Sequence, residues 1–234
     1  MKMIGNIMSK RIVIWSGGYD STLCLWNELQ KNKQAEAWSF VWSSINYDKN
    51  LAEHNVREKF KKKVKKLGYI INHKIINLRH EDIIPEGYSV MQASMFVPLT
   101  VFLAPLDSTI VFGFHWKDDY WAFSERFNEV IKSQCSVMNK NVELEFPLRN
   151  YKKWEIIRDI KVLKLEKYVW TCEFPLHNMK PCGNCEPCIN KKLALYENKI
   201  RNGNNKPMMK TVDIEVKEVS YCSVTKIEDE GTYV

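Results

Sequence analysis

Four short apolar runs, rich in β-branched and aromatic residues, punctuate the first 115 residues of the chain. Runs of this length and composition predict buried strands. They are RIVIW (11–15), AWSFVW (37–42), YIINHKIINL (69–78) and STIVFGF (108–114).

Between these runs the apolar residues recur at helical spacing, which predicts helices over residues 20–31, 51–67 and 95–106, the last one buried. Strands that alternate with helices favour a parallel sheet covered on both faces. The expected fold class is therefore α/β, with a Rossmann-like parallel sheet. In such a sheet ligands bind beyond the carboxyl ends of the strands, where Ser-Gly-Gly of residues 16–18 falls.

The second half of the chain continues with less regular spacing. Helices are predicted over 119–138 and 151–163, with a strand and turn in VELEFPL (142–148) between them. A Cys- and Pro-rich segment, 171–188, precedes a helix over 189–200. Residues 201–207 have the composition of a linker, and the alternation after them predicts a terminal strand or hairpin.

Composition and charge exclude several classes of protein. The chain has 234 residues, 45% of them hydrophobic, and a formal net charge of +7. No apolar run approaches the ~18 residues that span a membrane, and the N-terminus does not read as a signal peptide, so a cytoplasmic protein is expected. The lysine-rich KFKKKVKK (59–66) is typical of a solvated helix face; contact with RNA is the alternative.

The stretch VIWSGGYDST (13–22) carries the first candidate chemistry. A strand that turns through two glycines into a helix gathers backbone N–H groups and the positive end of the helix dipole at one point. Asp20 falls at or near the helix N-cap, where it caps the helix or helps to hold Mg²⁺ on a phosphate chain. Neither GxxxxGK[ST] nor GxGxxG is present, and an ordinary capped turn remains the alternative. The residues that would cradle a phosphate are Ser16, Gly17, Gly18, Asp20, Ser21 and Thr22.

Four cysteines have the spacing C-x₉-C-x₂-C-x₂-C. A C-x₂-C turn presents two sulfur atoms to one ion, and Gly183 relaxes the turn, so a tetrahedral zinc site is predicted. An iron–sulfur cluster and a disulfide pair are the alternatives, the second disfavoured in a reducing compartment. His177 lies inside the loop but is expected to be a bystander. The four predicted ligands are Cys172, Cys182, Cys185 and Cys188.

The string from Ser16 to Ser21 resembles the SGGxDS signature of the PP-loop (N-type) ATP pyrophosphatases. The resemblance implies a PP-loop, adenine nucleotide alpha hydrolase-like fold and a loop that binds the pyrophosphate end of ATP, with Mg²⁺. It also implies that Asp20 and Ser21 take part in catalysis.

The cysteine region narrows this resemblance. Thr171-Cys172 and Cys182-Gly-Asn-Cys-Glu-Pro-Cys188, with Pro147-Leu148 and Lys153 upstream, are similar to the 7-cyano-7-deazaguanine synthases, or QueC-like proteins. The resemblance covers roughly residues 10–196. It implies Lys153 as a further catalytic residue, one structural zinc ion per chain and a homodimer. The expected organisation is a PP-loop domain (1–165), a zinc-binding helical region packed on it (166–200), and a linker with a terminal strand or tail (201–234).

The resemblance also implies a reaction. ATP adenylates the carboxylate of 7-carboxy-7-deazaguanine, and ammonia displaces AMP to give an amide. A second ATP activates the amide oxygen, and loss of AMP yields the nitrile. ATP and a deazapurine are therefore the expected ligands, and zinc shapes one wall of the substrate pocket.

The middle of the chain departs from the family pattern. VMQAS (90–94) occupies the place where the family has a Pro-Gly-Arg-Asn-like stretch. AFSER (122–126) replaces a Tyr-Pro-Asp-Cys-Arg-like string, of which only Arg126 is retained. YDK (47–49) replaces Tyr-Gly-Gln, with Glu53 as a retained position. The ATP and zinc parts are kept, whereas the parts that read the substrate are altered.

Four functions are compatible with this pattern: a divergent synthase; a paralogue, of the kind found in antiviral systems, that joins the activated deazapurine to an amine of a protein or nucleic acid; a tRNA-modifying PP-loop enzyme; and a non-catalytic binding module. The paralogue hypothesis also includes a protein partner that docks on the tail. The cysteines spare for sulfur transfer are Cys24, Cys135 and Cys222, and the first two are expected to be buried small hydrophobes.

Candidate substrate residues cluster just after the fourth predicted strand. A planar base could stack on the aromatic residues of 115–123, Trp121 among them, although core packing is an equal alternative. Asp118 could accept two parallel N–H bonds from a guanidine-like edge. Together with Arg126, these residues form the expected substrate set.

Overall fold

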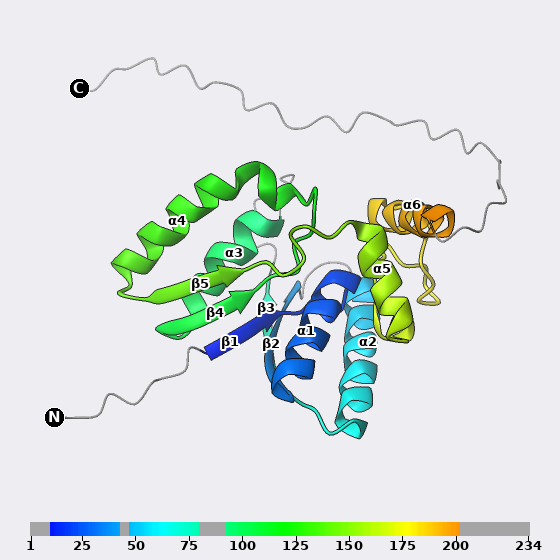
Figure 1. Ribbon diagram of the computed structural model, residues 1–234, viewed down its shortest axis with the longest axis horizontal. Helices are drawn as coiled ribbons and strands as arrows, with labels where there is room; N and C mark the ends of the chain where they lie inside the picture. Colours follow the sequence, from blue (N-terminus) through cyan, green and yellow to red (C-terminus); the bar gives the residue numbers. More distant parts are fainter. Residues whose placement is uncertain (1–9, 43–46, 80–91, 202–234) are drawn as a thin grey trace, which may run out of the picture.

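The computed structural model describes residues 10–42, 47–79 and 92–201 (Figure 1). The predicted linker and terminal strand after residue 201, most of the predicted tail domain and Cys222 lie outside the described residues. The helices and strands are β1 (Lys10–Ile14), α1 (Tyr19–Asn32), β2 (Gln34–Trp42), α2 (Tyr47–Lys66), β3 (Ile70–Leu78), α3 (Gln92–Leu103), β4 (Asp107–Val111), the 3₁₀ helix η2 (Asp119–Phe123), α4 (Ser124–Val137), β5 (Asn141–Glu145), α5 (Lys153–Val162), the 3₁₀ helix η3 (Glu166–Tyr168) and α6 (Glu186–Arg201).

The five strands form one parallel sheet in the order β3-β2-β1-β4-β5. β1 lies at its centre, where Val13 pairs with Ala37 of β2 and with Val111 of β4. The chain leaves β1 toward β2 and later returns to the other side of β1 through β4. This reversal of strand order opens a crevice beyond the carboxyl ends of β1 and β4. The expected α/β class with a parallel sheet is confirmed.

Helices cover both faces of the sheet, as predicted, because successive side chains of each strand point to opposite faces (Figure 1). Val13 and Val111 belong to a buried cluster that also contains residues of α1, α2 and α5. Ile110 and Phe112 belong to a second cluster, with residues of α3 and α4. No helix in the described part of the chain is long and apolar enough to cross a membrane.

Two predicted helices differ from the structure. Residues 119–138 are not one helix, because a 3₁₀ turn over Asp119–Phe123 precedes α4. The apolar segment predicted as a buried helix forms α3, but Phe102 is 53% exposed, because only one face of α3 packs on the sheet. The short η3 was not predicted.

Beyond α5, the chain forms the cysteine loop and α6, which packs against α5 (Figure 1). Ala194 of α6 belongs to the same buried cluster as Ile156 and Ile160 of α5. The four-cysteine region therefore rests directly on the helices that border the crevice.

Candidate active site and metal centre

The loop between β1 and α1 lies at the carboxyl edge of the sheet, where the parallel topology predicts a ligand site. Gly17 has φ +94°, in the left-handed region that favours glycine. A Cβ atom at Gly17 would also lie 3.2 Å from Cγ of Arg57 and 3.3 Å from Cγ2 of Val56. Glycine is therefore needed here both for backbone conformation and for space.

α1 begins directly after this loop. Its N-cap is Gly18, which places Asp20 near the N-cap, in the first turn of the helix. An α-helix leaves the amides of its first turn without intrahelical acceptors, and its dipole adds partial positive charge there. The end of α1 is therefore suited to an anion such as a phosphate.

The hydroxyl groups around the loop have two different environments. Ser16 and Ser21 lie together, with their Oγ atoms 3.0 Å apart, and the Gly18 amide donates to Ser16 Oγ at 3.2 Å. Thr22, by contrast, is fully buried, and its Oγ1 accepts a hydrogen bond of 3.0 Å from the Trp15 indole. The predicted phosphate cradle thus gathers Ser16 and Ser21, whereas the Thr22 side chain faces the core and fixes α1 against β1.

Asp20 and Lys153 meet at the crevice. The ammonium nitrogen of Lys153 lies 2.5 Å from Oδ2 of Asp20, although the residues are 133 positions apart. Oδ1 of Asp20 is buried without a hydrogen-bond partner among the described residues. Lys153 is the first residue of α5, whose start is fixed by a 2.7 Å bond from the Lys152 amide to the Glu155 carboxylate. Two of the predicted catalytic residues are therefore in contact.

Gly113, just beyond β4, is a site residue that sequence reasoning missed. A Cβ atom there would lie 2.9 Å from the amide nitrogen of Ser21 and 3.0 Å from the carbonyl carbon of Asp20. Since both are backbone atoms, the first turn of α1 could not keep its position beside a larger residue. The available signal was a glycine at the end of the apolar run STIVFGF (108–114).

A cavity of about 240 Å³ lies in the crevice. Asp118, predicted to contact substrate, shares it with residues of the loop between β1 and α1, the predicted phosphate loop (residues 16–22). Burial, and next the neighbouring Asp119, raise the pKa of Asp118 to about 7. Aromatic residues from β2, from α3 and from the segment just after β4 form the apolar wall. The residues that line the cavity are Ile14, Ser16, Asp20, Ser21, Phe40, Gln92, Ala93, Phe96, Phe112, Gly113, Phe114 and Asp118.

A second cavity, of about 530 Å³, lies on the other side of Lys153, between the residues after β4 and α6. Its lining includes Trp116, Lys153 and Thr171, together with Glu186 at the start of α6. Asp20 lines the first cavity and Lys153 lines the second, so their ion pair stands where the two cavities adjoin.

Arg57 of α2 holds the phosphate loop from behind. It is almost fully buried, donates a 2.5 Å hydrogen bond to the carbonyl oxygen of Ser16 and lies 3.4 Å from Glu53. Burial lowers the pKa of Arg57 and raises that of Glu53. Lys49 lies 3.8 Å from Glu53 and also pairs with Glu173, so α2 ties the loop to the cysteine region.

Two predicted substrate residues lie elsewhere. Trp121 donates its indole N–H to the His115 carbonyl at 2.7 Å, and the guanidinium of Arg149 covers its ring at 4.7 Å. Arg126 is exposed on the first turn of α4 and lines neither cavity described above. Cys24 is buried, as predicted, and burial raises the pKa of its thiol well above its usual range.

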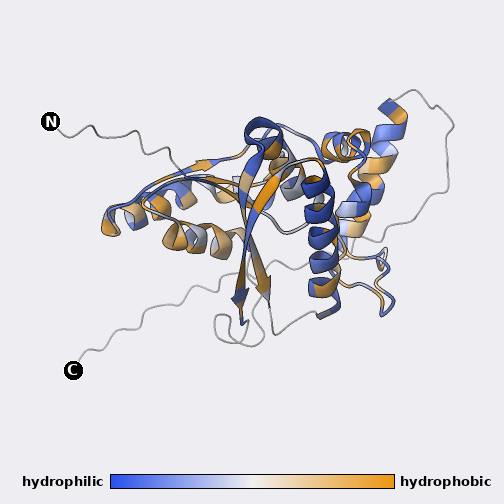
Figure 2. Ribbon diagram, turned by 90° about the horizontal axis from the view of Figure 1, so that it is seen from below, coloured by the Kyte–Doolittle hydropathy of each residue, from blue (hydrophilic) through white to orange (hydrophobic). Residues whose placement is uncertain are grey.

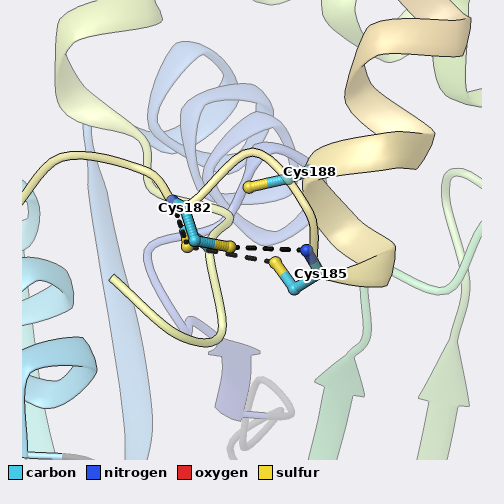
Figure 3. A group of neighbouring side chains, drawn as sticks. Cys182, Cys185 and Cys188 are labelled. Atoms are coloured by element: carbon cyan, nitrogen blue, oxygen red, sulfur yellow. Dashed lines mark hydrogen bonds between the residues drawn. The ribbon is translucent and has the colours of Figure 1, made fainter. Parts of the chain in front are cut away.

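The four predicted metal ligands converge; Figure 3 labels three of them, Cys182, Cys185 and Cys188. The sulfur atoms of Cys172, Cys182, Cys185 and Cys188 all lie within 4.8 Å of one another. A zinc–thiolate tetrahedron with bonds of about 2.3 Å has edges of about 3.8 Å, and the Cys172–Cys185 sulfur distance is 3.9 Å. The donor set and its size fit one tetrahedral ion.

Backbone amides around the cluster donate to the sulfur atoms. The amide of Cys182 lies 3.2 Å from the sulfur of Cys172, and the amides of Asn184 and Cys185 lie 3.4 and 3.3 Å from that of Cys182. These donors lower the pKa of Cys182 to about 6, so its metal-binding thiolate form is favoured. The His177 side chain is fully exposed and is not among the clustered ligands.

Comparisons with known proteins agree with this geometry. The family model of the queuosine biosynthesis protein QueC matches residues 109–199, which include Lys153 and all four cysteines. Two curated 7-cyano-7-deazaguanine synthases, from the Copenhageni and Lai serovars of Leptospira interrogans, are each 25% identical over 222 residues, covering 81% of this chain and 87% of the relative. The chain is QueC-like.

Solved structures similar to this QueC-like chain have low sequence identity. One is the U34-tRNA thiolase NcsA from Methanococcus maripaludis with its [4Fe-4S] cluster, at 15% identity and a TM-score of 0.49, covering 83% of this chain and 67% of that one. Another is a 4-thiouridine synthetase–RNA complex with bound ATP, at 17% identity and a TM-score of 0.45, covering 83% of this chain and 52% of that one.

Proposed function

We propose that this QueC-like chain uses ATP to adenylate the carboxylate of a 7-deazapurine, 7-carboxy-7-deazaguanine, and converts it with ammonia to the amide and then the nitrile. The observation that carries the proposal is the contact between Asp20 and Lys153 at the mouth of the phosphate loop, 2.5 Å apart. It joins the nucleotide motif to the region matched by the family model.

The geometry suits the departure of pyrophosphate. The phosphates of ATP would lie at the N-terminus of α1, against the hydroxyls of Ser16 and Ser21. Lys153 would stabilise the negative charge that develops on the leaving group. The unpartnered Oδ1 of Asp20 suits the hard oxygen coordination that Mg²⁺ prefers, and Mg²⁺ bound there would neutralise phosphate charge.

The substrate would occupy the larger cavity, with its carboxylate toward Lys153. A carboxylate oxygen attacks the α-phosphorus of ATP and pyrophosphate leaves, giving the acyl adenylate. Ammonia then displaces AMP to form the amide. In a second round the amide oxygen takes the adenylyl group, and loss of AMP and a proton leaves the nitrile.

The four-cysteine centre has a structural role in this proposal. Four thiolates fill a tetrahedral zinc shell and leave no open position for a reacting group. The ion would fix the loop between Cys172 and Cys188 and, through it, the adjoining Thr171, which lines the larger cavity.

One observation favours a second candidate, a paralogue that passes the activated carboxylate to an amine on a protein or nucleic acid. Two of the three altered segments, 47–49 and 122–126, contribute no residue to either cavity: Arg126 is exposed outside both, and Lys49 pairs with Glu173. Such a chain would keep the adenylation chemistry and change the acceptor.

The test is to incubate the purified protein with ATP, Mg²⁺ and 7-carboxy-7-deazaguanine, with and without ammonia, and to identify the products by mass. AMP together with the nitrile supports the synthase. AMP together with a deazapurine adduct on protein or added RNA supports the paralogue. Absence of AMP would overturn both. Analytical ultracentrifugation of the same sample tests the proposed homodimer.

A further inference from the structure

Four lysines of α2 form a stripe along one face of the helix. Lys59, Lys62, Lys63 and Lys66 follow the spacing i, i+3, i+4 and i+7, which places them side by side. Lys167 of η3 faces them across a groove of about 570 Å³, to which Leu67 and Tyr168 also contribute. We call this surface, with its five lysines, the lysine groove. α2 is drawn mostly in the blue of hydrophilic residues in Figure 2.

The lysine groove lacks compensating charge. Within the described part of the chain, none of its five ammonium groups forms an ion pair, whereas the neighbouring Lys61 pairs with Glu58 at 2.8 Å. Like charges at i, i+3 and at i, i+4 destabilise a helix. The helix dipole favours lysines in the last turn only, so it does not account for Lys59 or for Lys167 on another element.

We propose that the lysine groove binds the phosphodiester backbone of a nucleic acid. The proposal stands apart from the adenylation chemistry proposed above. The residue type favours this partner over a protein, because lysine is depleted in protein–protein interfaces, which are centred instead on aromatic and arginine anchors. The apolar contribution here is limited to Leu67, which is 50% exposed, and the partly buried Tyr168, whose ring lies under the ammonium groups of Lys63 and Lys167.

The same helix does not suit a membrane surface. An interfacial helix buries its apolar face in lipid. On α2 that face consists of Ala52, Val56, Phe60 and Val64, which are buried in the protein. Phosphate contacts need only positive charge at suitable spacing, and the lysines provide it without base-reading groups.

The dimensions also fit a strand of nucleic acid. Seven residues separate Lys59 from Lys66, which is about 10 Å along a helix axis. Along the axis of a duplex, where each strand has one phosphate per about 3.4 Å, that length corresponds to about three phosphates of one strand. The earlier part of α2 carries Arg57, which holds the carbonyl of Ser16. A nucleic acid in the lysine groove would therefore lie along the helix that supports the phosphate loop.

Fluorescence anisotropy on the full chain tests the proposal. The labelled ligands are a ~20-nucleotide single-stranded RNA, the corresponding RNA duplex and DNA of the same sequence, titrated at several salt concentrations. The test variant is Lys59→Gln/Lys62→Gln/Lys66→Gln, which leaves the partly buried Lys63 in place. The control is Lys132→Gln/Lys161→Gln/Lys199→Gln, which removes the same charge from exposed positions on α4, α5 and α6. Circular dichroism melting confirms that both variants fold.

We expect the wild-type chain to bind RNA, DNA or both, with affinity that falls as salt rises. The test variant should lose at least about tenfold in affinity, and its slope of log K against log salt should become shallower by roughly 2–3. The control should keep the wild-type slope. Equal loss in both variants would overturn the proposal, because net charge rather than the groove would then determine binding. Failure of the wild-type chain to bind any of the three ligands, or selective binding to vesicles of anionic lipid, would overturn it as well.

Discussion

The ammonium group of Lys153 lies 2.5 Å from a carboxylate oxygen of Asp20, across 133 residues of sequence. Asp20 belongs to the loop after the central strand, and Lys153 opens α5 in the segment that matches the QueC family model. The contact stands between the two cavities at the carboxyl edge of the sheet. One ion pair thus links the loop between β1 and α1 to the part of the chain that carries the four cysteines.

Replacing either partner should stop adenylation. Asp20→Asn removes the carboxylate that orients Lys153, and Lys153→Met removes the charge that would face the leaving pyrophosphate. We expect AMP release to fall by about 10²-fold or more in each variant, because charge stabilisation in a preorganised site contributes on this scale. Quantification of AMP by chromatography checks this, while metal content should stay at the wild-type level.

Asp159→Asn is the matched control, since Asp159 pairs with Arg158 on α5, away from the contact. It should leave AMP release unchanged. Wild-type AMP release by Asp20→Asn would show that the loop is not the ATP site.

Gly113→Ala should impair the site more than the fold. The new methyl group would lie 2.9 Å from the Ser21 amide nitrogen, so the first turn of α1 must move. Overpacking of this kind destabilises by about 1–3 kcal/mol, and the shift would also reduce ATP use. Gly68→Ala is the control: Gly68 has φ +81° but open space, so it should lose about 1 kcal/mol of stability and keep wild-type AMP release. Equal losses of AMP release in both variants would contradict this account.

Sequence patterns predicted the architecture well, because strand and helix signals in an α/β protein are local. The parallel sheet, its covered faces and the cysteine cluster follow from periodicity and spacing. Contacts between distant segments could not be read in this way. Arg57 is hidden in a lysine-rich helix, and nothing local indicates that it donates to the Ser16 carbonyl. Trp121 lies in an aromatic run whose sequence fits base stacking and core packing equally. Only the position of the Arg149 guanidinium over its ring distinguishes these two roles.

The four-cysteine centre should hold one zinc ion per chain and stabilise the fold. Cys182→Ser removes one ligand and should reduce bound zinc, measured by elemental mass spectrometry, to less than half an ion per chain. We expect the free energy of unfolding to fall by about 3 kcal/mol, hence roughly 6–12 °C in Tm, because metal binding contributes directly to folding. Cys135→Ser, at a partly buried cysteine outside the cluster, is the control. Iron and inorganic sulfide in the wild-type protein would instead establish a cluster.

His73 should make stability depend on pH. Its Nε2 lies 2.8 Å from Ser39 Oγ, and the Ser39 hydroxyl donates to the Trp15 carbonyl, so Nε2 carries a proton and donates to Ser39. Burial, and then the positive charges of Lys61, Arg57 and His54, lower the pKa of His73 to about 4, with Glu58 acting in the opposite direction. The neutral ring therefore supports the residue that precedes the phosphate loop.

The direction of the pH dependence follows from the protonation of His73 in the folded and the unfolded chain. Above pH 6.5 the ring is neutral whether the chain is folded or unfolded. Between pH 6.5 and about 4 the unfolded chain binds a proton that the folded chain does not, so stability falls as pH falls through this window. Because the ring is partly exposed, we expect a loss of about 1–2 kcal/mol rather than the full value of the pKa shift. Urea unfolding of the wild-type chain and of the His73→Gln variant across this pH window measures the loss of stability. The variant should lose less stability on acidification, whereas His177→Gln, at a fully exposed position that is not among the groups acting on His73, should behave as wild type. Parallel pH profiles for the wild-type chain and His73→Gln would show that the imidazole is not held neutral by the fold.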